Sequence, residues 1–493
     1  MAPSEHDSSL STLARAVPNG WPRITESSPV RDLGPGNMDY ERCAALHNEL
    51  VTRALQGRGG KMPPNPRTWW EAGTPSEEIA NILHPSLIEF LKRAWDEEVL
   101  PPMTWLFAYL GGSKCPHELR QPESYFDMLD DDDPGRFVKL YESSHYRAAD
   151  DEGIFFDQRT LKASFIEDTH DSFFIVTKEW AWMPLETILD SYLQMIDEGK
   201  VQAVSKDQAK LLKMDFLHGR MEPWIIHQYT KIDIERATAA FNRLLDAIDR
   251  RIPHADTPST PMNLPWHDPS TFENQDILPP SSFAHKFLKS VSTCTVRFRY
   301  IAPGIRFPTV SEFKNQPITD FATSPHKHLG EYPGHCPLRI LEIDHAEPQQ
   351  QHTVSRRYHG LTKLTAGLYL PRVVTRWSLS WSNGCQLILP FGIGHAGWAR
   401  HSTGEPFGVS NSDYSEEDPR PCDVNCDLYQ SGTTNGITNG HAVQIDRVLN
   451  NWADRVEKGD WEVDGQGVVG GIQKFKEADT EEHWHKYWVP LAW

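Results

Sequence analysis

Apolar residues recur at helical spacing in five stretches of the chain. In residues 76–99 they recur every three or four positions, at Ile79, Ile82, Leu83, Leu87 and Leu91. Pro85 should divide this stretch, because proline removes a backbone donor and collides with the preceding turn. The same spacing predicts helices over residues 185–199, 233–251, 444–458 and 472–488.

Other stretches alternate in polarity and are rich in β-branched and aromatic residues. Residues 154–183 predict two or three strands, and further strands are expected at 295–303, 338–346, 364–371 and 377–391. The chain should therefore belong to the mixed α+β class. We expect a helix-rich N-terminal half packed on a strand-rich C-terminal half, with the pocket between them.

Changes in composition suggest where the regions begin and end. Residues 1–35 are rich in Ser, Pro and charge and predict a flexible leader. A helix-rich region with a strand pair near 154–183 should occupy residues 36–251. Residues 252–281 are dense in proline and predict a linker. A strand-rich region with C-terminal helices should fill residues 282–493, interrupted by a polar insertion at about 402–441.

The net charge of the chain limits which kinds of molecule it is expected to bind. The 493 residues include 49 Lys and Arg against 68 Asp and Glu, a formal net charge of −19. Such a surface repels polyanions unless basic residues gather locally, and it suits a cationic substrate. No apolar run could span a membrane, and residues 1–23 lack the apolar core of a secretory signal. Seven scattered cysteines favour reduced thiols and a cytoplasmic location.

One motif resembles a nucleotide site. Residues 392–397 read GIGHAG, a literal G-x-G-x-x-G after an apolar run. A dinucleotide fingerprint needs a helix opening at the third glycine and an acid on a second strand further on. The continuation WARHSTGEPFG contains more glycine, a proline and no apolar stripe. The pattern therefore favours a strand followed by a glycine-rich loop that could line a pocket.

Acidic clusters offer candidate chemistry. Glu167, Asp168 and His170 lie together between two apolar segments, where carboxylates must be paired, hydrogen-bonded or functional. A histidine beside carboxylates is a plausible proton-transfer pair, so these three are the predicted catalytic residues, with His170 as general base. The alternative interpretation is a polar hairpin tip without function.

A metal-dependent enzyme and a non-catalytic binding protein are the two alternative hypotheses for the function of this chain. His326 and His328 are spaced to share one face of a strand, and with Asp344 they could form a two-histidine, one-carboxylate iron site of an oxygenase. Because 22 histidines make chance pairs common, we expect no metal and no other cofactor. A third possibility is a non-catalytic small-molecule-binding protein. Nucleophile elbows and phosphate-binding P-loops are absent from the sequence.

Three blocks, residues 296–308, 387–405 and 459–490, together resemble a family of fungal enzymes, the arginine-containing cyclodipeptide synthases. The resemblance covers most of the chain after residue 36. It implies an enzyme of secondary metabolism that joins the aminoacyl groups of two charged tRNAs, one of them arginyl-tRNA, and releases a cyclo(Arg-Xaa) diketopiperazine. The tRNA ester already activates the carboxyl group, so no ATP site is needed. Neither DNA nor a membrane is an expected partner.

The resemblance also bears on the residues of the site. A guanidinium substrate calls for carboxylate partners, and the candidates are Asp150, Asp151, Asp233 and Glu235. The family carries an acidic D-D-x-x-E motif, which this sequence lacks in literal form. Contact with tRNA would need local basic patches, either Arg297, Arg299 and Arg306 or Arg356, Arg357, Arg372 and Arg376, the second set with Tyr358 and Trp377 for stacking.

Overall fold

The computed structural model describes most of the chain and confirms a mixed α+β protein, rich in helix towards the N-terminus and in strand towards the C-terminus. The described residues are 21–34, 36–73, 75–101, 104–114, 119, 135–143, 153–166, 179–205, 207–208, 224–253, 261–273, 278–316, 337–344, 365–371, 381–407, 426–430, 436–437 and 442–493. They form two compact units. Unit 1 holds residues 1–176, 182–197 and 202–225, and unit 2 holds 177–181, 198–201 and 226–493.

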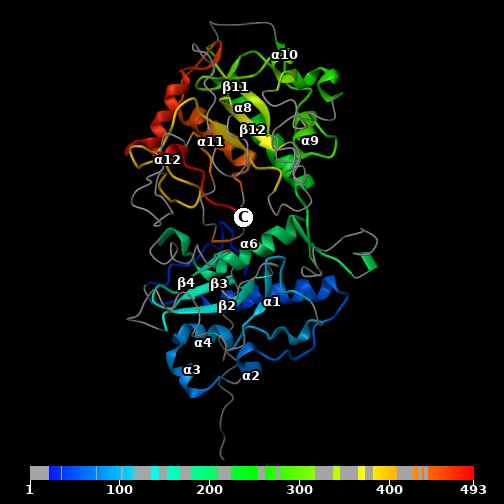
Figure 1. Ribbon diagram of the computed structural model, residues 1–493, viewed down its shortest axis with the longest axis vertical. Coiled ribbons are helices and arrows are strands. Elements are labelled where there is room, and N and C mark those ends of the chain that lie inside the picture. The colour runs from blue at the N-terminus through cyan, green and yellow to red at the C-terminus, as the bar shows by residue number, and fades with distance from the viewer. Residues whose placement is uncertain are drawn as a thin grey trace, which may run out of the picture. The chain divides into compact units, whose positions relative to one another are not determined.

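Unit 1 combines helices with an antiparallel sheet (Figure 1). Its helical elements are α1 (Tyr40–Gly57), α2 (Trp69–Gly73), α3 (Glu77–Ile82), α4 (Pro85–Leu91), the 3₁₀ turn η1 (Glu97–Val99) and α6 (Leu185–Asp197). Its sheet has the order β1 (Leu110–Ser113), β2 (Phe137–Ser143), β3 (Gly153–Asp157) and β4 (Lys162–Ile166). Helix α1 packs on α4 and α6, and α6 packs on β4.

Local sequence explains several boundaries in unit 1. The predicted division at Pro85 is confirmed: His84 caps α4 by accepting from the amide of Ser86, and Pro85 takes the first helical position. Helix α1 was not predicted. Asp39 caps it by accepting from the amide of Arg42. Of the predicted 154–183 strands, β3 and β4 are present, and residues 167–178 lie outside the described part.

The core of unit 1 encloses a histidine. His47 on α1 has no exposed surface. Its Nδ1 lies 3.0 Å from the hydroxyl of Tyr141, and its Nε2 lies 2.9 Å from the carbonyl of Trp95. The ring stacks on Trp69 at 6.1 Å between centroids. Burial lowers the pKa of His47 to about 4, so the ring is neutral inside the folded protein at neutral pH.

Unit 2 is built on a longer sheet. Among the described strands the order is β13 (Gln386–Ile388), β12 (Gly367–Pro371), β11 (Pro337–Ile343), β10 (Ile305–Arg306), β9 (Tyr300–Ala302), β15 (Gly467–Val468) and β14 (Val463–Asp464). All neighbours are antiparallel except β9 and β15, which meet in parallel at Tyr300 and Gly467. A short ladder of this unit pairs β7 (Met262–Asn263) with β8 (Thr295–Val296). A second short ladder, of β5 (Val201–Ala203) with β6 (Trp224–Ile226), lies mostly in unit 1, which holds residues 202–225.

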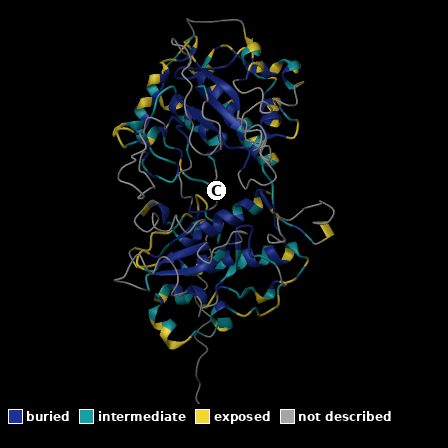
Figure 2. Cartoon of the chain, in the orientation of Figure 1, coloured by how far each residue is buried: buried dark blue, intermediate teal, exposed yellow. Residues whose placement is uncertain are grey.

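Helices α8 (Lys231–Arg251) and α9 (Phe283–Ser290) pack on this sheet. The other helical elements of unit 2 are α10 (Val310–Lys314), α11 (Ile445–Lys458) and α12 (Trp484–Tyr487), with 3₁₀ segments η3 (Glu179–Ala181), η6 (Pro265–His267), η7 (Pro269–Phe272) and η11 (Ile472–Asp479). Helices α8 and α11 pack along each other, and α8 also meets β9, β14 and β15. Strands of both units are largely dark blue in Figure 2, which marks them as buried.

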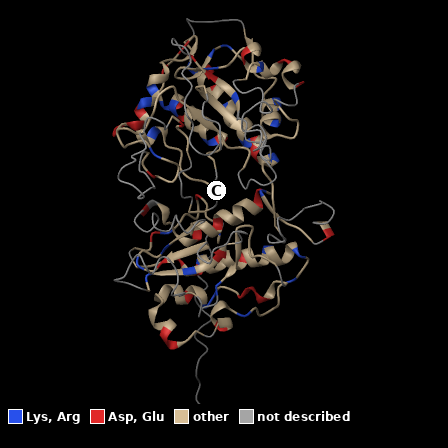
Figure 3. Cartoon of the chain, in the orientation of Figure 1, with Lys and Arg blue, Asp and Glu red and all other residues tan. Residues whose placement is uncertain are grey.

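Helix α8 shows how sequence fixes an element. A reciprocal capping box joins Thr230 and Asp233 at its start, and an apolar stripe of Ala237, Phe241, Leu244 and Ile248 is buried. Charges of both signs lie along α8 and α11 (Figure 3), and Arg243 of α8 pairs with Asp454 and Glu457 of α11 at 2.6 Å each.

Three expectations differ from the structure. Helix α8 was assigned with the N-terminal region, but its apolar stripe belongs to the core of unit 2. The 252–281 stretch, read as a linker, contributes buried Leu264, Trp266 and Leu278 to that core. The predicted 472–488 helix is also not continuous: the extended conformation of Thr480 separates η11 from α12.

Candidate functional site

The glycine motif forms a loop that wraps around a carboxylate. Residues 398–407, which directly follow Gly397, contain no helix, as the sequence indicated. Instead four backbone amides converge on Asp479 at the end of η11. Gly394 and Ala396 donate to one carboxylate oxygen at 3.0 and 2.8 Å, and Trp398 and Ala399 donate to the other at 2.8 and 3.0 Å. The loop is thus an anion-binding nest whose ligand is the protein's own side chain.

The three sequence blocks of the resemblance pack against one another in unit 2. The nest joins the 387–405 block to the 459–490 block, as does the indole of Trp488, which donates to the carbonyl of His401 at 2.8 Å. The 296–308 block meets the 459–490 block where Tyr300 pairs with Gly467. At Gly304 a Cβ atom would stand 2.3 Å from the amide nitrogen of Ile472, so these backbones are in close approach. Segments far apart in sequence therefore build one contiguous region.

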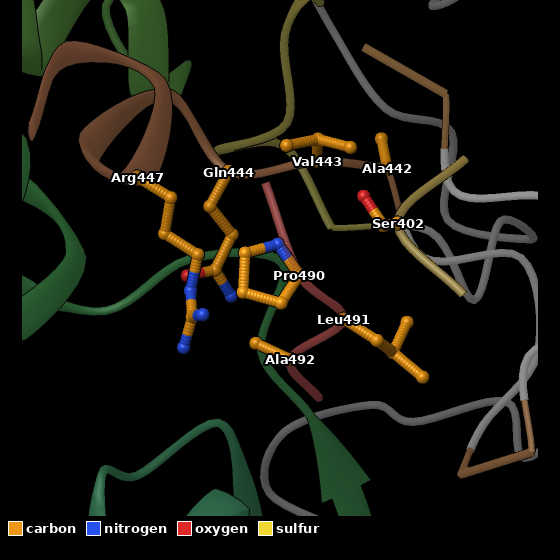
Figure 4. Close-up of a pocket in the computed structure, with 8 residues that line it drawn as sticks. All are labelled: Ser402, Ala442, Val443, Gln444, Arg447, Pro490, Leu491 and Ala492. Carbon is orange, nitrogen blue, oxygen red and sulfur yellow. The ribbon is translucent and has the colours of Figure 1, made fainter. Parts of the chain in front are cut away.

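A small pocket opens at the edge of this region (Figure 4). Ser402 of the 387–405 block and Pro490 of the 459–490 block line it, together with Ala442, Val443, Gln444, Arg447, Leu491 and Ala492. The backbone of Ser402 is fixed on both sides, because its amide donates to the carbonyl of Gln430 and its carbonyl accepts from the amide of Leu491, both at 2.8 Å. Gln444 donates from its side chain to the carbonyl of Trp493 at 3.2 Å. We call this hollow the Ser402 pocket.

A buried lysine lies behind one wall of the pocket. The side chain of Lys200 has no exposed surface. Its ammonium nitrogen is 3.0 Å from a carboxylate oxygen of Asp233 and 3.2 Å from the amide oxygen of Asn383. The ring of Trp381 lies 4.4 Å from it, within the range of a cation–π contact. We call these four residues the Lys200 cluster.

The surroundings of Lys200 act on the pKa of its ammonium group in opposite directions. Burial lowers the pKa of its ammonium to about 8, although the charge of Asp233 opposes this shift. Asp233 is itself well supplied with donors, since Thr230 donates from its amide and hydroxyl at 2.5 and 2.9 Å and Asn383 donates from its amide at 3.1 Å. A lysine with a lowered pKa is typical of functional sites, but the side chain of Lys200 is enclosed by its neighbours.

Backbone pairing joins the Lys200 cluster to the Ser402 pocket. The carbonyl of Asn383 accepts from the amide of Ile445 at 3.0 Å, and the amide of Cys385 donates to the carbonyl of Val443 at 2.8 Å. Gly384 forms a β-bridge with Gln444 between them. Val443 and Gln444 line the pocket, and α11 begins directly after them. The Lys200 cluster therefore holds the strand that positions this wall.

Most of the predicted site residues cannot be placed. Glu167, Asp168 and His170, the predicted catalytic group, lie outside the described residues, as do Asp150 and Asp151. Of the predicted substrate-binding acids, Asp233 is buried in the Lys200 cluster. Glu235 is exposed on α8 and pairs with Lys231 one turn earlier, at 2.9 Å. The structure does not bring Asp233 and Glu235 together at one site.

The predicted metal ligands and one basic patch have other partners where they are described. His326 and His328 lie outside the described residues. Asp344 accepts from the hydroxyl of Tyr300 at 2.5 Å and lies 3.6 Å from Arg306. Arg306 also pairs with Glu312 and Glu342 at 2.7 and 2.8 Å, while Arg297 pairs with Asp249. The patch of Arg356, Arg357, Arg372 and Arg376, with Tyr358 and Trp377, is outside the described residues.

Sequence reasoning missed the Lys200 cluster and the lining of the pocket. Lys200 stands alone in the stretch EGKVQA, where nothing distinguishes it from an exposed lysine. Asn383 follows Ser382 in a polar turn, and its partners lie more than 100 residues away. Only Ser402 carried a signal, because it falls in the glycine-rich block that was expected to line a pocket.

None of the described helices is both long and apolar enough to cross a bilayer. A scan against protein-family models finds no match to this chain. Searches of curated proteins and of solved structures likewise find no similar sequence and no similar fold.

Proposed function

We propose that this chain is a synthase that takes two aminoacyl groups from charged tRNAs, one of them arginyl-tRNA, and releases an arginine-containing cyclodipeptide. The observation that carries the proposal is the position of the Ser402 pocket. Its lining draws on two of the three blocks that resemble the cyclodipeptide synthases, and all three blocks pack together in unit 2. The substrates place the enzyme in the cytoplasm, where charged tRNAs are made and used.

The reaction needs positioning and proton transfer and no external energy source. The α-amino group of one aminoacyl ester attacks the ester carbonyl of the other, an amide bond forms, and one tRNA leaves with its terminal hydroxyl restored. The second amino group then attacks the remaining ester and closes the six-membered ring. Two amide bonds replace two ester bonds, and each amine proton ends on a released hydroxyl. A protein accelerates such a reaction by holding both esters in register.

The described residues supply two parts of this task. The Ser402 pocket offers a hydroxyl, an amide and a guanidinium on an otherwise apolar lining, which suits the polar end of a substrate. The Lys200 cluster is a positioning group for the wall that carries Gln444 and Arg447. The general base remains the predicted one, His170 with Glu167 and Asp168.

The test is production of the dipeptide by the purified protein. Incubated with arginyl-tRNA and a mixture of other charged tRNAs, the protein should release an arginine-containing diketopiperazine detectable by mass spectrometry. Prior treatment of the tRNAs with RNase should abolish the product. Ser402→Ala should reduce the rate, whereas Ser281→Ala, which alters an exposed serine of the same unit, should not.

Two results would count against the proposal. Folded protein that yields no diketopiperazine from any pair of charged tRNAs would remove the synthase function and leave a tailoring enzyme or a binding protein. A product unaffected by RNase would mean that free amino acids, activated in some other way, are the substrates. Loss of product on changing Glu167, Asp168 or His170 would place the catalytic residues where the sequence predicts them.

A further inference from the structure

The Ser402 pocket contains a guanidinium that forms no hydrogen bond and no ion pair within the described part of the chain. Arg447, in the first turn of α11, makes no hydrogen bond and no ion pair with any residue that the structure describes. It is only partly exposed, and burial lowers the pKa of its guanidinium. A guanidinium that has lost part of its hydration is costly without an anion beside it. The cost is offset when a ligand supplies that anion.

The neighbouring charges do not fill this role. The groups whose charges act on Arg447 are Asp446, Arg236 and Glu198. Glu198 is held by Arg236 in a two-pronged pair, at 2.7 and 2.6 Å. Asp446 precedes Arg447 in the helix but forms no ion pair with it. The guanidinium stays available for a ligand.

A second polar group faces the same hollow. Ser402 is 6% exposed, and its hydroxyl makes no hydrogen bond with any described residue. Figure 4 places Arg447 and Ser402 towards opposite ends of the lining, with Gln444 and Pro490 between them. The hydroxyl oxygen is not among the fully buried polar atoms without a partner, so it can reach a polar ligand that enters the hollow.

These observations define the chemistry of the ligand. The only formal charge among the lining residues is positive, so the pocket is unsuited to the arginine side chain of the substrate. It suits a phosphate, which a guanidinium binds through two parallel hydrogen bonds. Because the chain carries a net charge of −19, a polyanion needs local cations of this kind to approach.

We propose that the Ser402 pocket binds a phosphate group of the tRNA substrate near its acylated end, with Arg447 as the phosphate ligand. This proposal rests on the proposed function and adds the part of the substrate that the pocket receives. In this proposal the pocket recognises the RNA, while the guanidinium group of the arginyl substrate is bound by acidic residues elsewhere.

The test compares two variants, each of which removes one positive charge from a different position. Arg447→Gln removes the proposed ligand, and Arg250→Gln removes a guanidinium on α8 that is 67% exposed. Binding of an unacylated tRNA transcript is measured by filter retention from low to moderate salt. Arg447→Gln should weaken binding about tenfold and reduce the slope of log affinity against log salt by about one, while Arg250→Gln should change affinity less than about twofold. Arg447→Lys should keep the slope.

Inorganic phosphate serves as a second probe and identifies the source of the anion. If phosphate protects the wild type but not Arg447→Gln against heat, while tRNA binding is unchanged, the pocket holds free phosphate and the RNA assignment is overturned. Equal tRNA affinity and salt slope in all variants also overturns it. An Arg447-dependent tRNA complex that yields no dipeptide keeps this site and removes the synthase. If the wild type makes the dipeptide but Arg447→Gln binds tRNA unchanged, the synthase function stands and the phosphate site is removed.

Discussion

Lys200 and Asp233 form an ion pair of 3.0 Å in which neither side chain is more than 2% exposed. Residues 198–201 and helix α8 supply the two partners, and Asn383 contacts both. Such a pair is worth little as a net source of stability, because desolvation of both charges opposes their attraction. Its effect is to fix geometry, here the backbone that runs past Asn383 to the Ser402 pocket.

Removing one partner should be costly. Lys200→Met leaves the carboxylate of Asp233 buried without its cation, and we expect the free energy of unfolding to fall by about 3–5 kcal/mol. Urea unfolding followed by tryptophan fluorescence measures this. The double variant Lys200→Met, Asp233→Asn should lose less than the sum of the single changes. Strict additivity would show that the two groups do not interact.

The pH dependence of the same pair has a definite sign. The pKa of Lys200 is about 8 in the folded chain and about 10.5 when unfolded, so between these values the unfolded state binds more protons. The contribution of Lys200 to stability should therefore rise as pH increases from 8 to 10.5. The difference in unfolding free energy between the wild type and Lys200→Met, measured across this range, should show that slope, and a flat difference would contradict it.

His47 should affect stability with the same sign as Lys200, but in an acidic pH range. Its pKa is about 4 when folded against 6.5 when unfolded, so stability should be lost as pH falls from about 6.5 towards 4, by roughly 3 kcal/mol in all. His47→Gln retains a donor and an acceptor for Tyr141 and the carbonyl of Trp95 but does not titrate. Its unfolding free energy should lack this loss. Equal acid sensitivity in both proteins would place the sensitive group elsewhere.

A small anion should be able to take the place of the Asp479 carboxylate in the nest. Asp479→Ala leaves the amides of Gly394, Ala396, Trp398 and Ala399 without an acceptor, and we expect a loss on the order of 3 kcal/mol. Formate, which can occupy the vacated nest, should raise the melting temperature of Asp479→Ala more than that of the wild type. Chloride at the same ionic strength is the control. Equal responses to formate would argue against a nest that selects an anion.

Gly304 should tolerate no side chain. Its φ is +68°, and a Cβ would stand 2.3 Å from the backbone nitrogen of Ile472, so Gly304→Ala combines conformational strain with a clash. Gly397→Ala is the matched control, since its φ is +79° but no atom lies within 4 Å of the added carbon. We expect Gly304→Ala to cost several times more stability in thermal unfolding. Similar losses in both variants would show that only the backbone angle matters.

Local patterns predicted the elements of this fold better than its site. Helices α8 and α11 follow from apolar spacing, and the division at Pro85 follows from the chemistry of proline. The nest could not be found this way, because its ligand lies 80–85 residues beyond the glycines. The Lys200 cluster has the same character: a lysine, a helix cap and an asparagine acquire meaning only when the tertiary fold buries them together. For the predicted catalytic acids the sequence remains the only guide.

The assignment of residues 198–201 to unit 2, between two stretches of unit 1, affects how this protein can change over evolution. Lys200 lies in that insertion and depends on Asp233 and Asn383, which lie later in the chain. A single recombination point between the units would separate the lysine from its partners. The two units therefore cannot be exchanged independently of each other. Recombination between related genes should yield a folded protein only when both units come from the same parent.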